Sequence, residues 1–201
     1  MTDQGTVEDI ALDLADPLIA PLVPVPARAA LRLLWQLDAR LGEMAYSGNE
    51  PLLRAIKLRW WADQLAAIDR TEQHEPLLRE VATELGSVLG APGLSALAES
   101  WIACATEPTI AAAQHRGAVL FALSAALLPR RQSPISDLPG RRFGAVDWLL
   151  REGAPPGDPR WSEVGTDAPR NAMTSLPRAL TVLAGLATGI ARRHGVRDRR
   201  R

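Results

Sequence analysis

Helical periodicity is the feature that most constrains this chain, because it recurs in almost every segment and leaves no stretch with the alternation of a half-buried strand. The 201 residues are rich in alanine, leucine and arginine, and only 4% are aromatic, a mixture that favours helix over strand. A hydrophobic content of 47% is enough for one sizeable core. We therefore predict a single all-α domain over residues 1–201.

Proline, glycine and capping residues divide the chain into a series of helices. The predicted helices are Val7–Ala20, Ala27–Tyr46, Glu50–Asp69, Pro76–Leu89, Leu94–Cys104, Pro108–Leu128, Arg142–Glu152 and Leu176–His194. Gly90–Gly93 is expected to break the fourth helix from the fifth, and Pro129–Gly140 is expected to be a loop. Residues 153–175, rich in proline and glycine, are predicted to form a mobile irregular loop, and residues 195–201 a mobile basic tail.

Charge and cysteine content argue against several classes of protein, among them nucleic-acid-binding and disulfide-rich proteins. The 23 basic and 23 acidic residues cancel, so the chain has no overall attraction to nucleic acid. The single cysteine, Cys104, excludes an internal disulfide framework and suits a reducing compartment. The N-terminus shows no secretory signal, and no uncharged apolar run reaches the ~20 residues of a membrane span. We expect a cytoplasmic protein without a transmembrane segment.

Common catalytic and metal-binding motifs are missing. The sequence contains no HExxH, no CxxC, no phosphate-binding loop ending in GK[ST] and no GxSxG. The three histidines lie on different predicted segments, where caps and surface positions are their simplest roles. We therefore predict no metal site and no cofactor from motifs alone.

The stretch KLRWWADQLAAIDR, Lys57–Arg70, places two adjacent tryptophans on one predicted helix. At 100° per residue its apolar side chains form two arcs, one of Leu53, Ile56 and Trp60 and the other of Trp61, Leu65 and Ile68. This pattern predicts a helix packed between two neighbours. Lys57 and Gln64 project between the arcs. They either line a ligand cavity with Trp60 or belong to a buried helix with one amphipathic lysine, and this helix alone favours the second interpretation.

Gly185 and Gly189 lie one turn apart on the last predicted helix. In a soluble helix, such a pair usually allows a neighbouring backbone to approach closely. We predict that close packing inside the domain occurs there.

Three stretches resemble the squalene/phytoene synthase family. DPLIAPLVPVPARAALRLLWQLDARL, Asp16–Leu41, is similar to the opening of the family pattern, in which an apolar stretch, proline and arginine precede a helix. EPLLRAIKLRWWADQLAAI, Glu50–Ile68, is similar to its tryptophan-pair segment, and QHEPLLREV follows in the same order. The spacing from Leu31 to Ile68 is free of gaps. The nearest branch is the one that includes relatives of complex I assembly factors.

The resemblance implies the all-helical isoprenoid-synthase fold. In active members, two aspartate-rich motifs face each other and hold Mg²⁺ ions that bind the diphosphates of prenyl substrates. Such a clamp stabilises the negative charge of the leaving group, and an apolar cavity shields the carbocation from water.

Placed on this chain, both aspartate-rich motifs are depleted. The first falls on Trp35–Tyr46, where Gly42 and Tyr46 occupy the metal-binding positions and only Glu43 keeps a carboxylate. The second falls on Ala145–Pro156, where Arg151 survives, Glu152 replaces the first aspartate and Pro156 the last. Glu43, Arg151 and Glu152 are therefore the only catalytic candidates, and they are too few to ligate Mg²⁺ in the family's manner.

These observations lead to one leading hypothesis and two alternatives. The leading one is a non-catalytic binding or assembly protein without a cofactor, whose partner is an unknown protein or a prenyl lipid, in the cytoplasm and with peripheral contact with the inner membrane. The first alternative is a prenyl-diphosphate transferase in which Glu43, Glu152, Arg151 and Lys57 share the diphosphate with Mg²⁺. The second is a plain helical interaction module. A filled centre would favour a pseudoenzyme, and an exposed apolar patch would favour partner binding.

Overall fold

The structure, a computed structural model, describes residues 20–48, 50–128, 136–165 and 177–195, and these contain helices and no strand. The prediction of an all-α chain is confirmed. The helices are α1 (Arg28–Tyr46), α2 (Pro51–Ala66), α3 (Pro76–Glu84), α4 (Gly86–Thr106), α5 (Ile110–Ala126), α6 (Leu138–Arg151), α7 (Arg160–Glu163) and α9 (Arg178–Gly195), with two short 3-10 helices, η1 (Ala20–Leu22) and η2 (Val25–Ala27), before them. The predicted helix Val7–Ala20, apart from Ala20 in η1, and the predicted tail beyond Gly195 lie outside the described residues.

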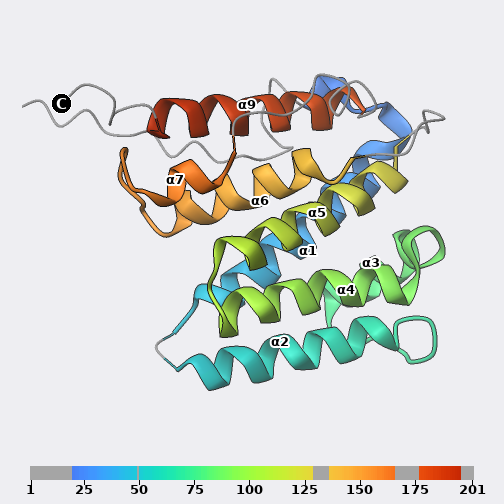
Figure 1. The fold of residues 1–201 in the computed structure, drawn as a ribbon. Helices are drawn as coiled ribbons and strands as arrows, with labels where there is room; N and C mark the ends of the chain where they lie inside the picture. Colours follow the sequence, from blue (N-terminus) through green and yellow to red (C-terminus); the bar gives the residue numbers. More distant parts are fainter. Residues whose placement is uncertain (1–19, 49, 129–135, 166–176, 196–201) are drawn as a thin grey trace, which may run out of the picture.

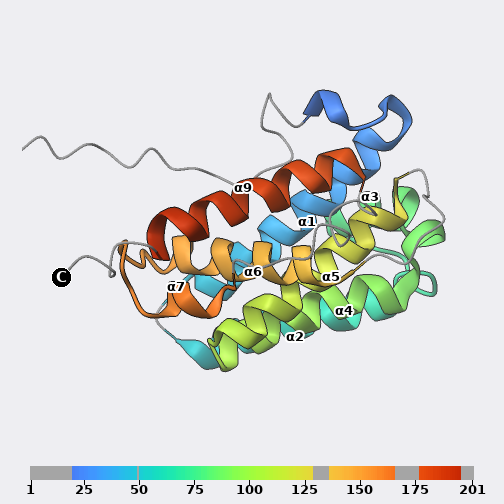
Figure 2. The ribbon, with the colours of Figure 1, turned by 45° about the horizontal axis from the view of Figure 1, so that its top comes forward.

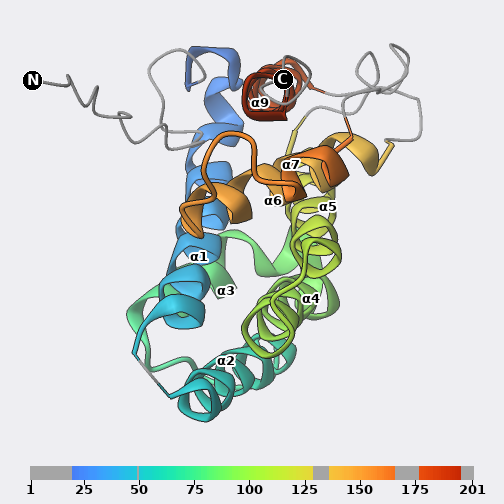
Figure 3. The ribbon, with the colours of Figure 1, turned by 60° about the vertical axis from the view of Figure 1, so that its left-hand side comes forward.

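The helices form a stack of layers. Figures 1 and 3 show α9 at one edge, followed by α6, then α5, then α4, with α2 at the opposite edge. Figure 2 shows α9 and α6 running side by side. Helix α1 runs along one side of the stack and contacts α2, α3, α4 and α5. This arrangement brings α1, α4, α5 and α6 together around the centre of the domain.

The apolar face of α1 forms a large part of the core. Leu31, Leu34 and Leu41 are fully buried, as their spacing predicts. Trp35, on the same face, meets the edge of Phe143 from α6 with ring centroids 5.4 Å apart. Aromatic pairs in this geometry are worth about 0.5–1.5 kcal/mol beyond the area they bury, so this contact helps to join α1 to α6.

Local capping chemistry sets several helix starts. Pro51 and Pro76 occupy the first turns of α2 and α3, where the missing backbone N–H has no cost. The Glu75 carboxylate accepts a hydrogen bond from the backbone N–H of Leu78 at 2.7 Å. Thr109 caps α5 in the same way through the N–H of Ala112 at 3.2 Å. These signals explain why α2, α3 and α5 begin close to their predicted positions.

The break predicted at Gly90–Gly93 is confirmed, because Gly90 is non-helical and two helical stretches meet there at a kink. The chain has an additional break that the sequence does not predict, at Leu85 between α3 and α4. The label α4 covers the two helical stretches on either side of Gly90. Gly90 adopts φ = 67° and ψ = 159°, which only glycine takes at low cost, and helical geometry resumes with Pro92 in the new first turn. Glycine and proline therefore end one helical stretch and start the next, as the sequence predicts.

Helices α5 and α6 approach each other most closely at three glycines. A methyl group on Gly140 would stand 2.6 Å from the Gly117 carbonyl oxygen, and one on Gly144 would overlap the Ala113 carbonyl oxygen. Backbone therefore packs directly on backbone here. The predicted close contact at Gly185 and Gly189 is wrong, because a methyl group on either residue would meet open space.

Two segments predicted as irregular contain helix. α6 begins at Leu138, inside the loop predicted for Pro129–Gly140. α7 lies inside the segment 153–175, because its Trp161 is buried and anchors the turn. The Trp161 indole donates to the Pro155 carbonyl oxygen at 3.0 Å, and its ring centroid lies 4.6 Å from that of His194 on α9. One large side chain thus orders a stretch that its proline and glycine content predicts to be irregular.

Only one of the two apolar arcs of α2 is buried, so the prediction of a helix covered on two sides is wrong. Trp61, Leu65 and Ile68 are buried, and α2 packs extensively on α4. Leu53, Ile56 and Trp60, the other arc, are exposed. The spacing of apolar residues shows which faces of a helix are apolar, but it does not show which of them another helix covers.

Helix α4 is long and apolar enough to cross a membrane by length and composition alone. Core helices of soluble proteins meet the same criterion, so this property is weak evidence for a membrane span. In this fold α4 lies between α2 and α5 and packs against both.

Candidate functional site

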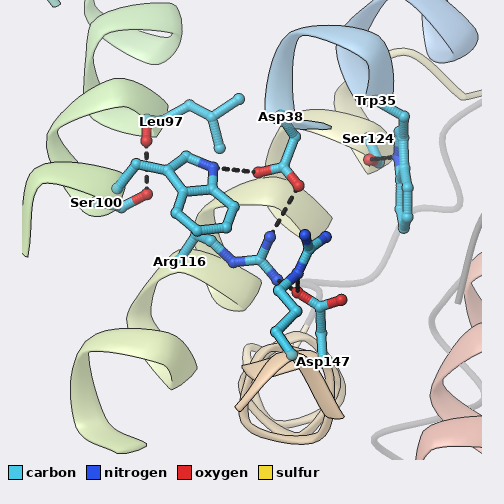
Figure 4. A network of polar contacts seen from close by, with 9 residues as sticks. Trp35, Asp38, Leu97, Ser100, Arg116, Ser124 and Asp147 are labelled. Atoms are coloured by element: carbon cyan, nitrogen blue, oxygen red, sulfur yellow. Dashed lines mark hydrogen bonds and ion pairs between the residues drawn. The ribbon is translucent and has the colours of Figure 1, made fainter. Parts of the chain in front are cut away.

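The centre of the domain holds a network of charged side chains from different helices (Figure 4). Arg116 of α5 lies between Asp38 of α1 and Asp147 of α6. Its Nη1 donates to Asp38 Oδ2 at 2.8 Å, and its Nη2 donates to Asp147 Oδ2 at 2.7 Å. Only 2% of the Arg116 side chain is exposed. These residues, with Trp101 and Arg151, form what we call the central network.

Trp101 of α4 closes the network on one side. Its indole Nε1–H donates to Asp38 Oδ1 at 2.7 Å, so both oxygens of this carboxylate accept hydrogen bonds. The Arg116 guanidinium lies over the Trp101 ring, 4.5 Å from its centroid. Arg116 is therefore held by two carboxylates and by the face of an aromatic ring.

Arg151 of α6 extends the network towards the surface. Its Nε donates to Asp147 Oδ2 at 3.0 Å, and its guanidinium lies 5.9 Å from the Trp101 centroid. The Arg151 side chain is 38% exposed. Two carboxylates and two guanidinium groups balance in charge, which reduces the free-energy penalty of burying them.

Burial and ion pairing shift the pKa values of Asp38 and Arg116. Burial raises the pKa of the Asp38 carboxyl, although the Arg116 guanidinium opposes the shift. Burial alone would lower the pKa of the Arg116 guanidinium, but Asp38 and Asp147 raise it above its ordinary value. Arg116 therefore stays charged over the whole range in which proteins fold.

The central network holds helices together and offers no free carboxylate to a ligand. Its carboxylates are already engaged by guanidinium and indole donors, so they are poor ligands for a cation. Among the described residues, no group of three or more histidine, cysteine, aspartate or glutamate side chains is placed to hold a metal ion. The network instead joins α1, α4, α5 and α6, and a buried ionic cluster penalises arrangements in which its members do not meet.

The structure separates the three catalytic candidates. Glu43 is exposed and pairs with Arg40 on the same helix at 3.0 Å. Glu152 is exposed just after the end of α6. Arg151 alone joins the central network. The two glutamates therefore point to solvent and not to the buried centre.

Gly42 and Tyr46, which the sequence resemblance would put at metal-binding positions, both lie against Trp101. A methyl group on Gly42 would stand 3.0 Å from two atoms of the Trp101 ring, and Arg151 lies close by. The Tyr46 ring meets Trp101 edge-on with centroids 6.2 Å apart, and burial raises the pKa of its hydroxyl. The Trp101 ring thus occupies the space beside positions 42 and 46.

Lys57 and Trp60, predicted to line a ligand cavity with Gln64, face solvent. Lys57 is exposed, and so is 47% of Trp60. The rings of Trp60 and Trp61 meet edge to face. Gln64 is half-buried. The structure places Lys57 and Trp60 on the outer side of α2, away from the central network.

Sequence reasoning missed Asp38, Trp101, Arg116 and Asp147. A signal was present for two of them, because each is a charged residue on an apolar helical face. Asp38 follows Leu34 by four residues and precedes Leu41 by three, and Arg116 precedes Leu120 by four. A charge at such a position predicts a buried partner. It does not identify that partner, which lies 78 residues away for the pair Asp38 and Arg116.

No family model, curated protein or solved structure matches this chain.

Proposed function

We propose that this protein is a non-catalytic binding or assembly protein with an isoprenoid-synthase type of helical fold. One observation carries the proposal. Gly42, at a metal-binding position of the family pattern, packs against Trp101, and the adjoining space is filled by the ion pairs of Arg116. A filled centre is what a chain that keeps a synthase scaffold without its chemistry would require.

The electrostatics support the same conclusion. Diphosphates bridged by Mg²⁺ need several carboxylate ligands that are free to bind the metal. The buried carboxylates of Asp38 and Asp147 already neutralise Arg116. Diverting them to a metal would leave a buried guanidinium without its partners, which costs about 3–5 kcal/mol.

A binding role is supported by the surface of α2. Leu52, Leu53, Ile56 and Trp60 are all exposed on this one helix. Exposed apolar side chains that gather on one face are typical of interaction sites.

A turnover assay tests the proposal directly. The full chain is incubated with Mg²⁺ and a prenyl diphosphate, and release of inorganic diphosphate is followed. We expect no release above that of a blank without protein. Release that needs Mg²⁺ and is lost in Glu43→Gln or Glu152→Gln, but not in the exposed control Glu163→Gln, would support the prenyl-diphosphate transferase instead.

Affinity capture from the native cells in mild detergent identifies what the protein binds. A stoichiometric protein partner is expected for an assembly protein. A bound prenyl lipid without a protein partner would redefine the role as lipid binding.

A further inference from the structure

The outer face of α2 carries four exposed apolar side chains, Leu52, Leu53, Ile56 and Trp60, which we call the α2 stripe. Their exposed fractions are 71%, 54%, 55% and 47%. Three of them recur every four residues, so they form one line that is ~12 Å long at the rise of a helix. Figures 1 and 3 show α2 at the edge of the stack. The stripe therefore lies on the outside of the domain.

Cationic side chains flank the α2 stripe on both sides. At 100° per residue, Arg59 lies next to the line of Leu52, Ile56 and Trp60 on one side, and Lys57 lies beyond Leu53 on the other. Both are exposed. Asp63, the acid nearest the stripe on this helix, lies beyond Trp60 at the C-terminal end. An apolar line with a basic border is thus built into a single helix.

We propose that the α2 stripe docks on the interfacial region of an anionic lipid bilayer. A helix that lies in this plane buries its apolar side chains ~5–10 Å into the bilayer and places lysine and arginine at the headgroups. Trp60 suits the interface, because its ring is apolar and its N–H reaches polar groups. The stems of Lys57 and Arg59 allow their charges to reach phosphates while their methylene groups stay among the acyl chains.

The shape and charge of the stripe favour a lipid surface over a second copy of the chain. A single convex helix with separately projecting side chains fits a bilayer, which conforms around each of them. A rigid partner would need a matching groove. Two copies that met through this stripe would bring the basic borders of both to the rim of the contact, and like charges there oppose association.

This inference deepens the proposed binding role by naming its surface and partner chemistry. It does not depend on whether the protein has lost catalysis. Vesicle binding and diphosphate release are separate measurements, so either proposal can fail alone.

Co-sedimentation with vesicles tests the inference. The full chain is mixed with vesicles of equal parts phosphatidylglycerol and phosphatidylcholine, and with vesicles of phosphatidylcholine alone. We expect binding to the anionic vesicles and at least about tenfold weaker binding to the neutral ones. Lys57→Gln with Arg59→Gln should weaken anionic binding by about fivefold for each cation, or about 25-fold together.

Two triple variants distinguish binding by the α2 stripe from non-specific binding by exposed apolar side chains elsewhere. Leu52→Ser, Ile56→Ser and Trp60→Ser together should abolish sedimentation. Val25→Ser, Val88→Ser and Leu186→Ser remove as many exposed apolar side chains from η2, α4 and α9, and should leave it unchanged. Circular dichroism melting checks that both variants fold.

Three results would overturn the inference. The first is the absence of sedimentation with anionic vesicles. The second is binding that survives in the stripe variant, which would assign it to the arginine-rich segment Arg192–Arg201 that every variant keeps. The third is a dimer in sedimentation velocity that the stripe variant dissociates, which would assign the stripe to a second copy.

Discussion

The guanidinium of Arg116 meets the carboxylate of Asp38 at 2.8 Å, across 78 residues of sequence and inside the core of the domain. The pair joins α5 to α1. The second ion pair of Arg116, with Asp147, adds α6. One arginine therefore determines the relative positions of three helices, and the fold depends on it more than on any exposed ion pair.

Replacing Arg116 by methionine should destabilise the protein strongly. The variant leaves Asp38 buried without its cation, while Asp147 keeps its ion pair with Arg151. Breaking a buried pair in this way costs about 3–5 kcal/mol. Urea unfolding followed by circular dichroism measures the loss. The control is Arg40→Met, which removes the exposed ion pair with Glu43 and should cost about 1 kcal/mol or less. Equal losses in the two variants would mean that the central network contributes little to stability.

Replacing Gly144 by alanine should prevent α5 and α6 from packing as they do. The new methyl group would overlap the Ala113 carbonyl oxygen and stand 2.8 Å from the backbone nitrogen of Gly117, and backbone cannot yield as a flexible side chain can. We expect a loss of more than about 4 kcal/mol, or failure to fold, in thermal melting.

The matched control for that variant is Gly189→Ala on α9, where a methyl group meets open space. This substitution should stabilise the helix by about 0.5–1 kcal/mol, because alanine loses less backbone entropy on folding. If Gly144→Ala melted at the same temperature as Gly189→Ala, the close contact of α5 and α6 would be disproved.

Placing an aspartate at position 42 should not create a metal site. Its Cβ would stand 3.0 Å from the Trp101 ring, which is itself fully buried, so the side chain has no room. We expect Gly42→Asp to lose stability and Gly42→Ala to lose about 1–3 kcal/mol through overpacking alone. Isothermal titration with Mg²⁺ is the readout for metal binding. Heat of binding in a folded Gly42→Asp variant that the parent lacks would show that the centre can accept a cation.

The single thiol provides a pH-dependent reporter of folding. Burial raises the pKa of Cys104 to about 11. The unfolded thiol loses its proton above its ordinary pKa of 9.0, whereas the folded thiol keeps it up to about pH 11. The free energy of unfolding therefore falls as pH rises through this window. The contribution is at most about 3 kcal/mol.

Two measurements check the thiol. Iodoacetamide should modify the native protein slowly near pH 8 and the guanidinium-unfolded protein fully. Urea unfolding of Cys104→Ala should show a shallower decline of stability from about pH 9 to 11 than the parent shows. Rapid modification of the native protein would contradict the burial of Cys104.

Much of the helical pattern follows from the sequence because its causes are local. The starts of α2, α3 and α5 depend on proline and side-chain caps within four residues of each start. These signals can be recognised in the sequence alone. The course of α7 depends instead on Trp161, whose burial against α9 is not a local property. Proline and glycine content therefore misled the prediction for that segment.

The sequence by itself determined that this chain is helical, where α1, α2 and α5 lie, and which faces of them are apolar. Only the tertiary structure decided which apolar arc of α2 is covered, which glycines lie at a helix contact and which charges meet in the centre. The physical reason is the same in each case. Helix formation depends on neighbours within one or two turns, whereas burial depends on which helices pack together, and Asp38, Trp101, Arg116 and Asp147 acquire their roles only when four separate helices meet.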